Sequence, residues 1–345
     1  MEFPVTAPGG ESDQRVTCFG FILVLLSGPS GLTGACRVPT GSPKGVPMPP
    51  AEWSTAPVAL PPASLTFAGI VSALRGAGCV FAEEEAALLM AECSGPAELA
   101  RGVQRRRAGI PLEYVLGWAE FFGQRIEVGQ GVFVPRRRTE LLVQTALELL
   151  APTDPVPVST VPSSPVPVGH APSAHALSSV VVDLCCGSGA VGATLLAVHP
   201  DLELHASDLD PAAAACARRN VEKMGGRVYE GDLFAALPVS IRGRVQVLAV
   251  NAPYVPSDAI RTMPPEARLH EPRLSLDGGP DGLDIHRLVA ASAPGWLSAD
   301  GHLLIETSEQ QAAGTASIVA SAGLAVRTVR SEELDGTLVV GTKGS

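Results

Sequence analysis

The carboxyl-terminal half of the chain alternates between short apolar runs and longer segments in which apolar residues recur at helical spacing. Its clearest run, residues 180–184, contains three consecutive valines without apolar-polar alternation, which is typical of a parallel strand covered on both faces. We therefore expect a buried strand there and a helix from about Ala190. Further strands are predicted at 203–207, 227–230, 245–250, 302–306, 325–329 and 337–340, and helices at 211–224, 283–296 and 309–321. This succession predicts an α/β fold with a doubly wound, mainly parallel sheet and antiparallel strands only at its end.

The amino-terminal half has a different pattern. Three segments with helical spacing, broken by glycine and proline, predict helices at 65–74, 83–93 and 96–107. Apolar-polar alternation then predicts a hairpin over 120–134, and a helical period follows at 139–150. We divide this part into a small helical substrate-binding lobe, 63–110, and a hairpin with a linking helix, 111–150. The catalytic domain is expected over 180–345, with a polar loop at 256–282.

Two stretches lack any core pattern. Residues 1–62 are rich in Pro, Gly, Ser and Thr, and we expect a disordered extension or an over-long start with Met48 as the true beginning. Their apolar run, 18–26, is too short to span a bilayer, and acids outnumber Arg15 where a signal peptide would be basic. The stretch 151–179, rich in Pro, Val and Ser, is predicted to be a mobile surface insertion without chemistry.

The composition narrows the class of protein. Of 345 residues, 46% are hydrophobic and 17% are charged, which is enough to bury a core and argues against an overall disordered chain. The net charge of -10 disfavours a large nucleic-acid footprint. None of the seven cysteines forms a C-x-x-C pair, so we predict no metal and no disulfide framework. We expect a cytoplasmic monomer without a membrane partner or stable nucleic-acid binding.

The turn after the first strand carries the strongest candidate chemistry. Gly187, Gly189 and Gly192 have G-x-G-x-x-G spacing, which lets a ligand approach the backbone and the free N–H groups of the next helix. Asp208, about 20 residues further on, is placed to accept both hydroxyls of an adenosine ribose. NAD and S-adenosylmethionine fit this pattern equally. Asp183 favours the methyl donor, because dinucleotide-binding turns usually carry an apolar residue there.

Two more strands end in polar turns. Asp232 and Leu233 follow the strand at 227–230 and could hold an adenine, the acid on its amino group and the leucine against its face, although an Asp-capped turn is an alternative. The tetrad Asn251-Ala252-Pro253-Tyr254 follows 245–250. Because ligands of open parallel sheets bind beyond the carboxyl ends of the strands, the tetrad should face the same edge as the glycine turn. Its alternative is ordinary Asn-x-Pro turn chemistry.

Taken together, these stretches resemble the HemK/PrmC family of protein (glutamine-N5) methyltransferases over about residues 105 to 340. Before the first strand, the resemblance is carried by 111–117 (Pro-Leu-Glu-Tyr-Val-Leu-Gly), 120–122 (Glu-Phe-Phe), 134–136 (Val-Pro-Arg) and 139–140 (Thr-Glu). After it, the resemblance is carried by 183–189, Asp208, 232–233, the tetrad, 270–274 (His-Glu-Pro-Arg-Leu), 276–279 (Leu-Asp-Gly-Gly) and 281–283 (Asp-Gly-Leu). Their order and spacing together are specific.

The resemblance implies a Rossmann-like class I methyltransferase fold. It also implies methyl transfer from S-adenosylmethionine to a glutamine side chain, in the Gly-Gly-Gln motif of a release factor or in a ribosomal protein. The implied cofactor-binding residues are Asp183, Cys185, Cys186, Gly187, Ser188, Gly189, Asp208, Asp232, Leu233 and Asn251. The implied substrate-binding residues are Asn251, Ala252, Pro253, Tyr254, Arg136 and Glu271. Arg136 and Glu271 would orient the loops around the acceptor or form a structural ion pair.

The chain departs from the family pattern in three respects. The family usually reads Asn-Pro-Pro-Tyr, and here Ala252 replaces the first proline. Cys185 and Cys186 stand where Gly and Thr are common, and we interpret them as small packing residues. The amino-terminal lobe, which in the family helps to engage the protein substrate, is shorter than usual.

The chemistry explains why the tetrad is needed. An amide nitrogen is a poor nucleophile, so the main task is to place it in line with the methyl group at about 3 to 3.5 Å. We assign the catalytic roles to Asn251, Ala252 and Tyr254. The Asn251 side-chain carbonyl and the Ala252 backbone carbonyl would accept the two amide hydrogens, and Tyr254 would offer a flat face. Two alternatives stay open: an adenine-N6 methyltransferase acting on DNA or RNA, and a cofactor-binding homologue that Ala252 has weakened.

Overall fold

The computed structural model describes residues 65–151 and 179–345, so the predicted extension at 1–62 and almost all of the predicted insertion at 151–179 lie outside the described residues. The first three helices lie where they were expected: α1 (Phe67–Gly76), α2 (Ala82–Glu92) and α3 (Pro96–Arg107). They share a small apolar core of their own, which includes Ile70, Leu74, Leu89 and Val103. None of the helices in the described ranges is both long and apolar enough to cross a bilayer.

The predicted hairpin exists but is shorter than expected. Its strands are β1 (Trp118–Phe121) and β2 (Gln124–Glu127), with the short helix α4 (Leu112–Leu116), which was not predicted, before them. Phe122 and Gly123 both have positive φ, 52° and 71°, which is the turn that matches the twist of two antiparallel strands. The chain then passes through a 3-10 turn, η2 (Arg137–Thr139), into α5 (Glu140–Leu150).

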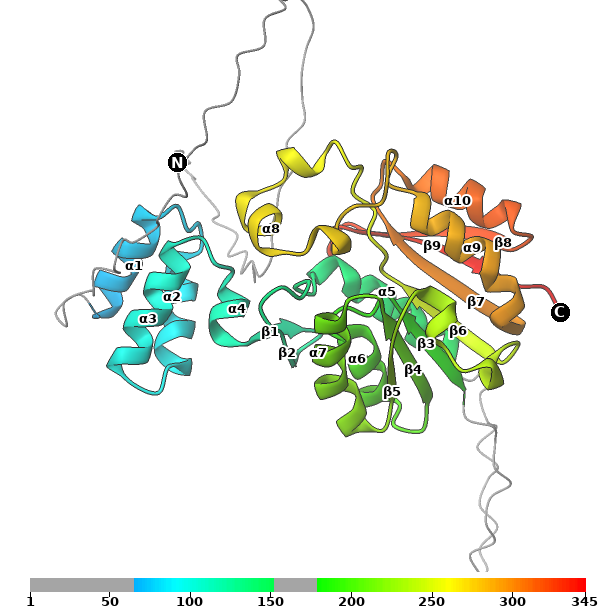
Figure 1. Cartoon of the computed structure of the whole chain (residues 1–345), viewed down its shortest axis with the longest axis horizontal. Helices are drawn as coiled ribbons and strands as arrows, with labels where there is room; N and C mark the ends of the chain where they lie inside the picture. The colour runs from blue at the N-terminus through cyan, green and yellow to red at the C-terminus, as the bar shows by residue number, and fades with distance from the viewer. Residues whose placement is uncertain (1–64, 152–178) are drawn as a thin grey trace, which may run out of the picture. The chain divides into compact units, whose positions relative to one another are not determined.

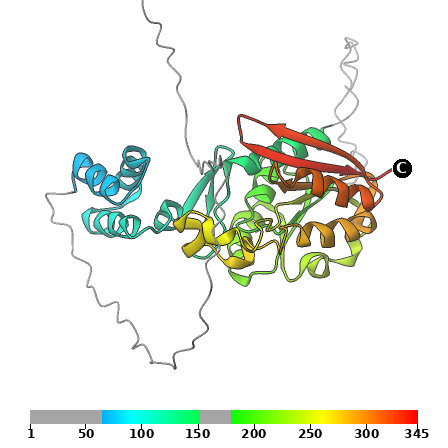
Figure 2. The same ribbon diagram turned by 90° about the horizontal axis from the view of Figure 1, so that it is seen from above.

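The main sheet has seven strands in the order β5-β4-β3-β6-β7-β9-β8. The bounds of its strands are β3 (Val180–Leu184), β4 (Glu203–Asp208), β5 (Arg227–Glu230), β6 (Val245–Val250), β7 (Leu297–Thr307), β8 (Ala325–Ser331) and β9 (Gly336–Thr342). The first five pair in parallel, and β9 is antiparallel to both β7 and β8. Figure 2 shows the two antiparallel strands side by side in red. This confirms the predicted doubly wound, mainly parallel, Rossmann-like sheet.

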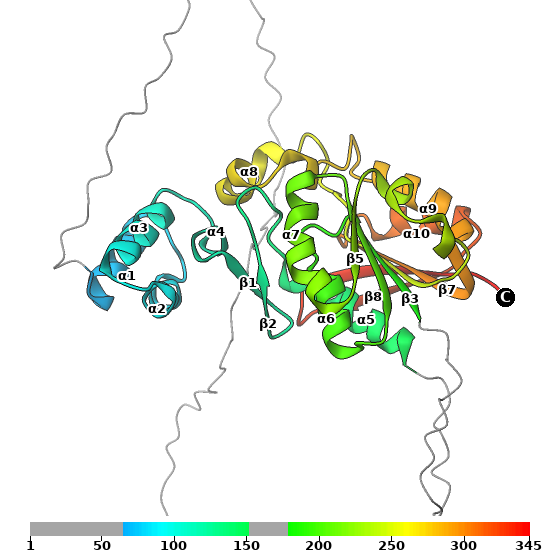
Figure 3. The same cartoon turned by 60° about the horizontal axis from the view of Figure 1, so that its bottom comes forward.

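Helices cover both faces of this sheet (Figures 1 and 3). One face packs against α5, α6 (Ala190–Val198) and α7 (Pro211–Val221), and the other against α9 (Asp284–Trp296) and α10 (Ala312–Ser321). Along β6, Val247 and Ala249 belong to the first core, whereas Leu248 and Val250 belong to the second. Because both faces are buried, the strand reads as a continuous apolar run.

Two regions differ from the expectation. The segment expected as a polar loop, 256–282, contains the helix α8 (Pro265–His270), whose first residue is a proline, as suits a helix N-terminus. Strand β7 begins at Leu297, five residues before the expected 302. Its pairing with β6 shifts register between Val245 and Val247, and Asp300 has a φ of 57°, so an irregular first half hid the strand in the sequence.

Candidate functional site

The glycine turn joins β3 to α6, and its glycines have different structural roles. Gly187 has a φ of 55°, and a Cβ built on it would meet nothing within 4 Å, so its backbone is open to a ligand. Gly189 has a φ of 76°, and a Cβ there would lie 2.8 Å from Cγ2 of Val221 in α7. The first glycine therefore permits approach, and the second permits packing of α6 against α7. Ser188, between them, is buried, and its carbonyl accepts a hydrogen bond of 2.8 Å from Nδ2 of Asn220.

Asp183 lies beneath the turn. Its Oδ2 accepts a hydrogen bond of 2.9 Å from the Gly192 amide. A Cβ on Gly192 would stand 2.9 Å from Cδ2 of Leu204, so the third glycine lets the helix approach β4 closely. Burial of Asp183 raises the pKa of its carboxyl from 3.8 to about 7, although the Gly192 hydrogen bond lowers it. The predicted acid is thus placed under the turn as a support.

Asp208, the last residue of β4, hydrogen-bonds to the glycine turn. Its Oδ2 accepts a hydrogen bond of 2.8 Å from the Gly187 amide, and its Oδ1 accepts one of 2.9 Å from the Asp210 amide. A carboxylate oxygen has a second lone pair, so both oxygens can still accept a hydrogen bond from a ligand. Burial raises the pKa of Asp208, and these backbone hydrogen bonds oppose the rise.

Asp232 and Leu233 are brought to the same edge. Their strand, β5, pairs with β4 so that Glu230 is the register partner of Asp208. The Gly231 amide also donates a hydrogen bond of 2.9 Å to the Asp208 carbonyl. Asp232 is exposed, and Leu233 is partly buried with a positive φ of 43°. The two residues therefore stand at the carboxyl end of the strand next to Asp208.

The charge around the turn distinguishes the possible ligands. Burial raises the pKa of the Cys185 thiol, and the charged groups that raise it further are the carboxylates of Asp208, Asp183 and Asp232. Burial likewise raises the pKa of Cys186 well above its usual value, so both thiols are neutral and serve as packing residues. Three carboxylates at one turn disfavour an anionic pyrophosphate and favour a ligand with positive charge. S-adenosylmethionine, with its sulfonium and ammonium groups, fits this set of residues.

The tetrad follows the strand next to the glycine turn. Leu184, the last residue of β3, is the register partner of Val250, the last residue of β6. Adjacent strands lie about 4.8 Å apart, so Cys185 and Asn251 leave the same edge of the sheet side by side. Nδ2 of Asn251 donates a hydrogen bond of 3.2 Å to Oγ1 of Thr139 in η2. Ala252 is buried in the core that faces α9.

Tyr254 is anchored through its hydroxyl, which donates a hydrogen bond of 3.4 Å to Oε1 of Glu306 near the end of β7. Burial and the Glu306 charge raise the pKa of Tyr254, while Arg138 opposes the rise. Thr139 lies in a stretch that resembles the family but had no predicted role, and Glu306 was not predicted to be a site residue. Glu306 had a signal, because it is an acid directly after the apolar run Leu303-Leu304-Ile305, as Asp183 is after three valines.

Arg136 and Glu271, the predicted substrate-binding pair, do contact each other as an ion pair. Oε1 of Glu271 also accepts a hydrogen bond of 3.4 Å from the Val134 amide, and the Arg136 guanidinium lies 5.0 Å from the centre of the Phe133 ring. Burial raises the pKa of Glu271, and Arg136 opposes the rise. The pair fixes the end of α8 to the segment that precedes η2.

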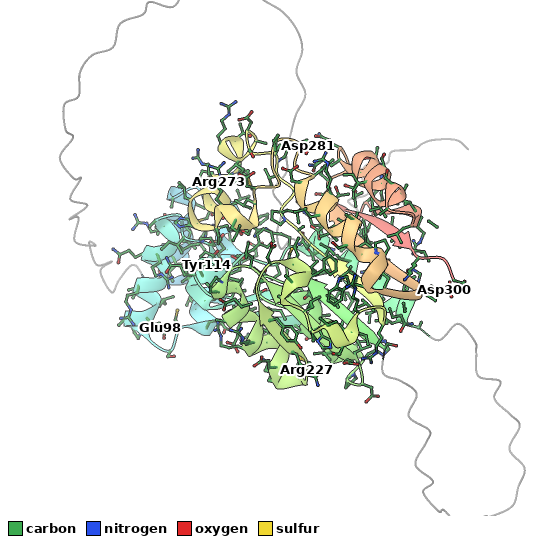
Figure 4. The ribbon with its side chains drawn as sticks, turned by 45° about the vertical axis from the view of Figure 1, so that its right-hand side comes forward. Glu98, Tyr114, Arg227, Arg273, Asp281 and Asp300 are labelled. Atoms are coloured by element: carbon green, nitrogen blue, oxygen red, sulfur yellow. The ribbon has the colours of Figure 1, made fainter. Side chains whose placement is uncertain are left out.

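The loop between the tetrad and α9 is tied back on itself. Val255 and Asp277 form an isolated bridge, and Arg273 donates hydrogen bonds to Asp277 at 2.9 and 3.0 Å. Nε2 of Gln311 donates hydrogen bonds of 2.9 Å to the carbonyls of Tyr254 and Asp281. Figure 4 labels Arg273 and Asp281, which both lie in this loop. These contacts restrain the backbone on the carboxyl-terminal side of the tetrad.

The family model and the known proteins that this chain resembles are all described as methyltransferases. The family model for the methyltransferase small domain matches residues 169–264, which include the glycine turn and the tetrad. The chain is 36% identical over 222 residues to the release factor glutamine methyltransferase of Geobacter sulfurreducens, covering 63% of this chain and 68% of that protein. It is 35% identical over 216 residues to the protein of the same name from Moorella thermoacetica, covering 61% of this chain and 66% of that protein.

A relative with a different acceptor is almost as similar. The 4-amino-L-phenylalanine/4-methylamino-L-phenylalanine methyltransferase of Streptomyces pristinaespiralis is 33% identical over 221 residues, covering 64% of this chain and 69% of that protein. All three relatives are named as methyltransferases, and the two names differ in the molecule that they give as the methyl acceptor.

Proposed function

This chain belongs to the release factor glutamine methyltransferase family, and on that premise we propose that it transfers a methyl group from S-adenosylmethionine to the side-chain nitrogen of a glutamine in a protein. The acceptor we propose is a peptide-chain release factor, and the second candidate is a ribosomal protein. We further propose that the enzyme works as a monomer in the cytoplasm and binds no nucleic acid stably. Its net charge of -10 supports the last point.

The observation that carries this proposal is the shared register of two strand ends. Leu184 and Val250 are partners, so the turn proposed to hold the cofactor and the tetrad proposed to hold the acceptor leave adjacent strands at one edge. Such juxtaposition is what methyl transfer requires, because the acceptor nitrogen must come within about 3 to 3.5 Å of the methyl group. The residues we propose for the cofactor are those of the glycine turn together with Asp183, Asp208, Asp232, Leu233 and Asn251.

We propose that the main contribution of the protein to the reaction is to position the acceptor nitrogen against the methyl group. When bound, S-adenosylmethionine supplies a methyl group on a positively charged sulfur, which is already a strong electrophile. The amide nitrogen of the acceptor is a weak nucleophile, so the chain must hold it and stabilise the positive charge that develops on it. Asn251 Oδ1 and the Ala252 carbonyl are the two proposed acceptors for the amide hydrogens. Tyr254 is proposed to flank the acceptor, and the Arg136–Glu271 pair to fix the loop beside it.

The test uses the full chain with S-adenosylmethionine labelled in its methyl group. Three acceptors are offered in parallel: a release factor that carries the Gly-Gly-Gln motif, total RNA, and 4-amino-L-phenylalanine. We expect a methyl group only on the glutamine of that motif, as located by mass spectrometry of its peptide. Label confined to RNA would make the enzyme an adenine methyltransferase, and label confined to the amino acid would make it an arylamine methyltransferase. Either result would overturn the proposal.

A variant separates catalysis from cofactor binding. Asn251→Ala should lower kcat at saturating S-adenosylmethionine by about 100-fold or more, because it removes an acceptor aimed at the reacting amide. Loss of its contact with the cofactor would raise the KM for S-adenosylmethionine and leave kcat unchanged, so the two roles are separable. The control is wild-type chain offered a release factor whose motif glutamine is replaced by alanine, which should receive no label. If the wild-type chain binds the cofactor but transfers methyl to none of the acceptors, the chain is a weakened homologue and the proposed activity is wrong.

A further inference from the structure

Helix α8, drawn in yellow in Figure 1, is held by an ion pair at each end. In its first turn, the Glu266 carboxylate lies 2.7 Å from Nη1 of Arg106 in α3. Directly after its last residue, Glu271 contacts Arg136 as an ion pair and accepts a hydrogen bond of 3.4 Å from the Val134 amide. A helix of six residues is not stable by itself, so these contacts with distant parts of the chain fix its position.

Arg106 connects α8 to the amino-terminal lobe. Its Nε and Nη2 donate hydrogen bonds of 2.6 and 3.0 Å to the two carboxylate oxygens of Glu85 in α2, which leaves Nη1 to contact Glu266. A guanidinium is planar and has five donors, so it can hold one carboxylate bidentately and still contact a second one. Arg106 is buried, and its ion pairs are therefore screened less by salt than those on the surface. The lobe and α8 are thus joined through one buried guanidinium.

The segment from α8 to the next 3-10 turn, η7 (Arg273–Ser275), exposes two large apolar side chains. Leu269 is 66% exposed and Leu274 is 50% exposed, and they are the two exposed large apolar residues among the described residues between the tetrad and α9. Single exposed apolar residues are normal on a protein surface. Two of them on one short segment with a fixed position are typical of a surface that binds another protein.

This segment belongs to a loop that begins and ends beside the tetrad. Val255, directly after the tetrad, forms an isolated bridge with Asp277, and its amide donates a hydrogen bond of 2.9 Å to the Leu276 carbonyl. Leu276 and Asp277 directly follow η7. A protein whose glutamine is bound at the tetrad would therefore lie next to the loop that carries α8.

The charges of the segment indicate which kind of partner it fits. Glu266 and Glu271 are both paired with arginines from other parts of the chain, and Arg273 is paired with Asp277 at 2.9 Å. Arg268 is exposed, and no acid in the described part of the chain forms an ion pair with it. An apolar pair beside an unpaired positive charge is complementary to an apolar patch flanked by an acidic side chain.

We propose that residues 265–275 form a docking surface for the acceptor protein, the release factor, outside its reacting glutamine. Leu269 and Leu274 are the apolar contacts of this docking surface, and Arg268 faces an acidic side chain of the partner. Arg106 and Glu266 are positioning residues, because they hold the docking surface to the lobe. The inference rests on the proposed function, since it assigns a surface to the same acceptor.

The first test separates binding of the acceptor protein from methyl transfer. The double variant Leu269→Ala/Leu274→Ala should raise the KM for the complete release factor by about 10-fold and change kcat by less than about twofold, because the lost contacts do not change during transfer. A short Gly-Gly-Gln peptide offers the glutamine without the rest of the protein, so its kcat/KM should be equal for the variant and the wild type. Leu288→Ala is the matched control, because Leu288 is 55% exposed but lies in α9. An unchanged KM for the release factor in the double variant would overturn the proposal.

A second variant tests the ion pair that positions the docking surface. Glu266→Gln removes the charge that contacts Arg106 but leaves Arg106 paired with Glu85, so the stability of the lobe in urea should not change. The KM for the release factor should rise by about 2- to 10-fold, because the docking surface is less preorganised, while kcat/KM for the peptide stays the same. Glu83→Gln makes the same change in the Arg75–Glu83 pair within the lobe and is the control. An equal KM for the release factor in both variants would overturn the positioning role of Arg106 and Glu266.

A binding measurement does not depend on methyl transfer. The full chain is titrated in a calorimeter with a release factor whose motif glutamine is replaced by alanine, and the double variant should bind it about 10-fold more weakly than the wild type. Size-exclusion chromatography of both chains gives the oligomeric state. A wild-type dimer that the double variant converts to a monomer would identify a second copy of this chain as the occupant and would overturn the proposal.

The outcomes distinguish the docking surface from the proposed function. If the wild type methylates no glutamine but binding weakens in the double variant, the proposed function fails and the docking surface stands. If glutamine is methylated and the release factor binds equally to both chains, the proposed function stands and the docking surface is wrong. If the wild type neither methylates nor binds the release factor, both are wrong.

Discussion

The Asp183 carboxylate and the Gly192 amide are joined by a hydrogen bond of 2.9 Å that holds the first turn of α6 over the end of β3. Asp183 is only 3% exposed. Burial raises the pKa of its carboxyl from 3.8 to about 7. The folded protein therefore binds a proton at Asp183 more tightly than the unfolded chain does, and this links the stability of the cofactor turn to pH.

The sign of this linkage gives the first prediction. Between pH 3.8 and about 7, folded Asp183 keeps a proton that the unfolded chain has lost, so stability falls as pH rises through this window. A difference of about three pKa units corresponds to about 4 kcal/mol. Asp183→Asn removes the titration. Without cofactor, the free energy of unfolding of Asp183→Asn minus that of the wild type should therefore increase by about 4 kcal/mol between pH 4 and pH 8.

Urea unfolding of both proteins at several pH values measures this difference. Asp201→Asn, the same substitution at an exposed position, is the control for the replacement itself. Parallel profiles for Asp183→Asn and wild type would show that the Asp183 proton has no part in the stability of the turn.

Gly189 should be the least replaceable residue of the turn. In Gly189→Ala the new Cβ would both occupy a φ of 76° and meet Val221 at 2.8 Å. The left-handed backbone costs roughly 1 to 2 kcal/mol and the overpacking roughly 1 to 3 kcal/mol, so we expect a loss of stability of at least about 2 kcal/mol. Gly243→Ala is the matched control, with a φ of 77° and open space around its Cβ. It should lose only the backbone part, as measured by urea unfolding.

The buried arginine of the lobe gives a third prediction. Arg106 is 6% exposed and donates to both carboxylate oxygens of Glu85, which is 8% exposed, at 2.6 and 3.0 Å. It also contacts Glu266 of α8 at 2.7 Å. Arg106→Ala would leave Glu85 buried without its partner, so it should destabilise the lobe by about 3 to 5 kcal/mol.

A surface pair in the same lobe serves as the control. Arg75 and Glu83 form an ion pair in which the side chains are 63% and 43% exposed, so Arg75→Ala should cost less than about 1 kcal/mol. Hydrogen exchange of the α1 to α3 amides measures both effects in the full chain. If the two variants lost equal protection, burial of the Arg106–Glu85 pair would not matter for stability.

The sequence predicts the strands of this fold well because both faces of the sheet are buried. Uninterrupted apolar runs such as 180–184 and 245–250 have few alternatives, and their ends agree with β3 and β6. Helix α8 escaped prediction because it has only six residues and is held by distant partners, Glu266 by Arg106 and Glu271 by Arg136. Local propensity cannot decide a helix so short.

Site residues could be predicted where the neighbouring sequence shows their position, as it does for Asp183, Asp208 and the three glycines at the ends of predicted strands. Glu306 also follows an apolar run, but nothing local in the sequence identifies Tyr254 as its partner or Thr139 as the partner of Asn251. Thr139 is 112 residues from Asn251, and Glu306 is 52 residues from Tyr254. Only the strand order and the passage of η2 beside β6 bring these side chains together. The predicted roles of the site residues in binding and catalysis stay predictions.

Ala252, where the family usually has proline, gives the last prediction. Any residue has a backbone carbonyl, so the proposed second acceptor survives the substitution. Pro253 still restricts residue 252 to extended conformations, and Ala252 is 2% exposed, which restrains it further. The missing proline therefore changes the free energy of forming the turn by no more than about 0.4 to 1 kcal/mol.

Ala252→Pro should raise kcat by no more than about 2- to 5-fold, measured with labelled cofactor and the Gly-Gly-Gln release factor. Asn251→Ala in the Ala252→Pro chain should be as inactive as in the natural one, which checks that Asn251 acts independently of the proline. A thousandfold gain from Ala252→Pro would mean that the first proline, and not the backbone carbonyl it carries, is what the reaction needs.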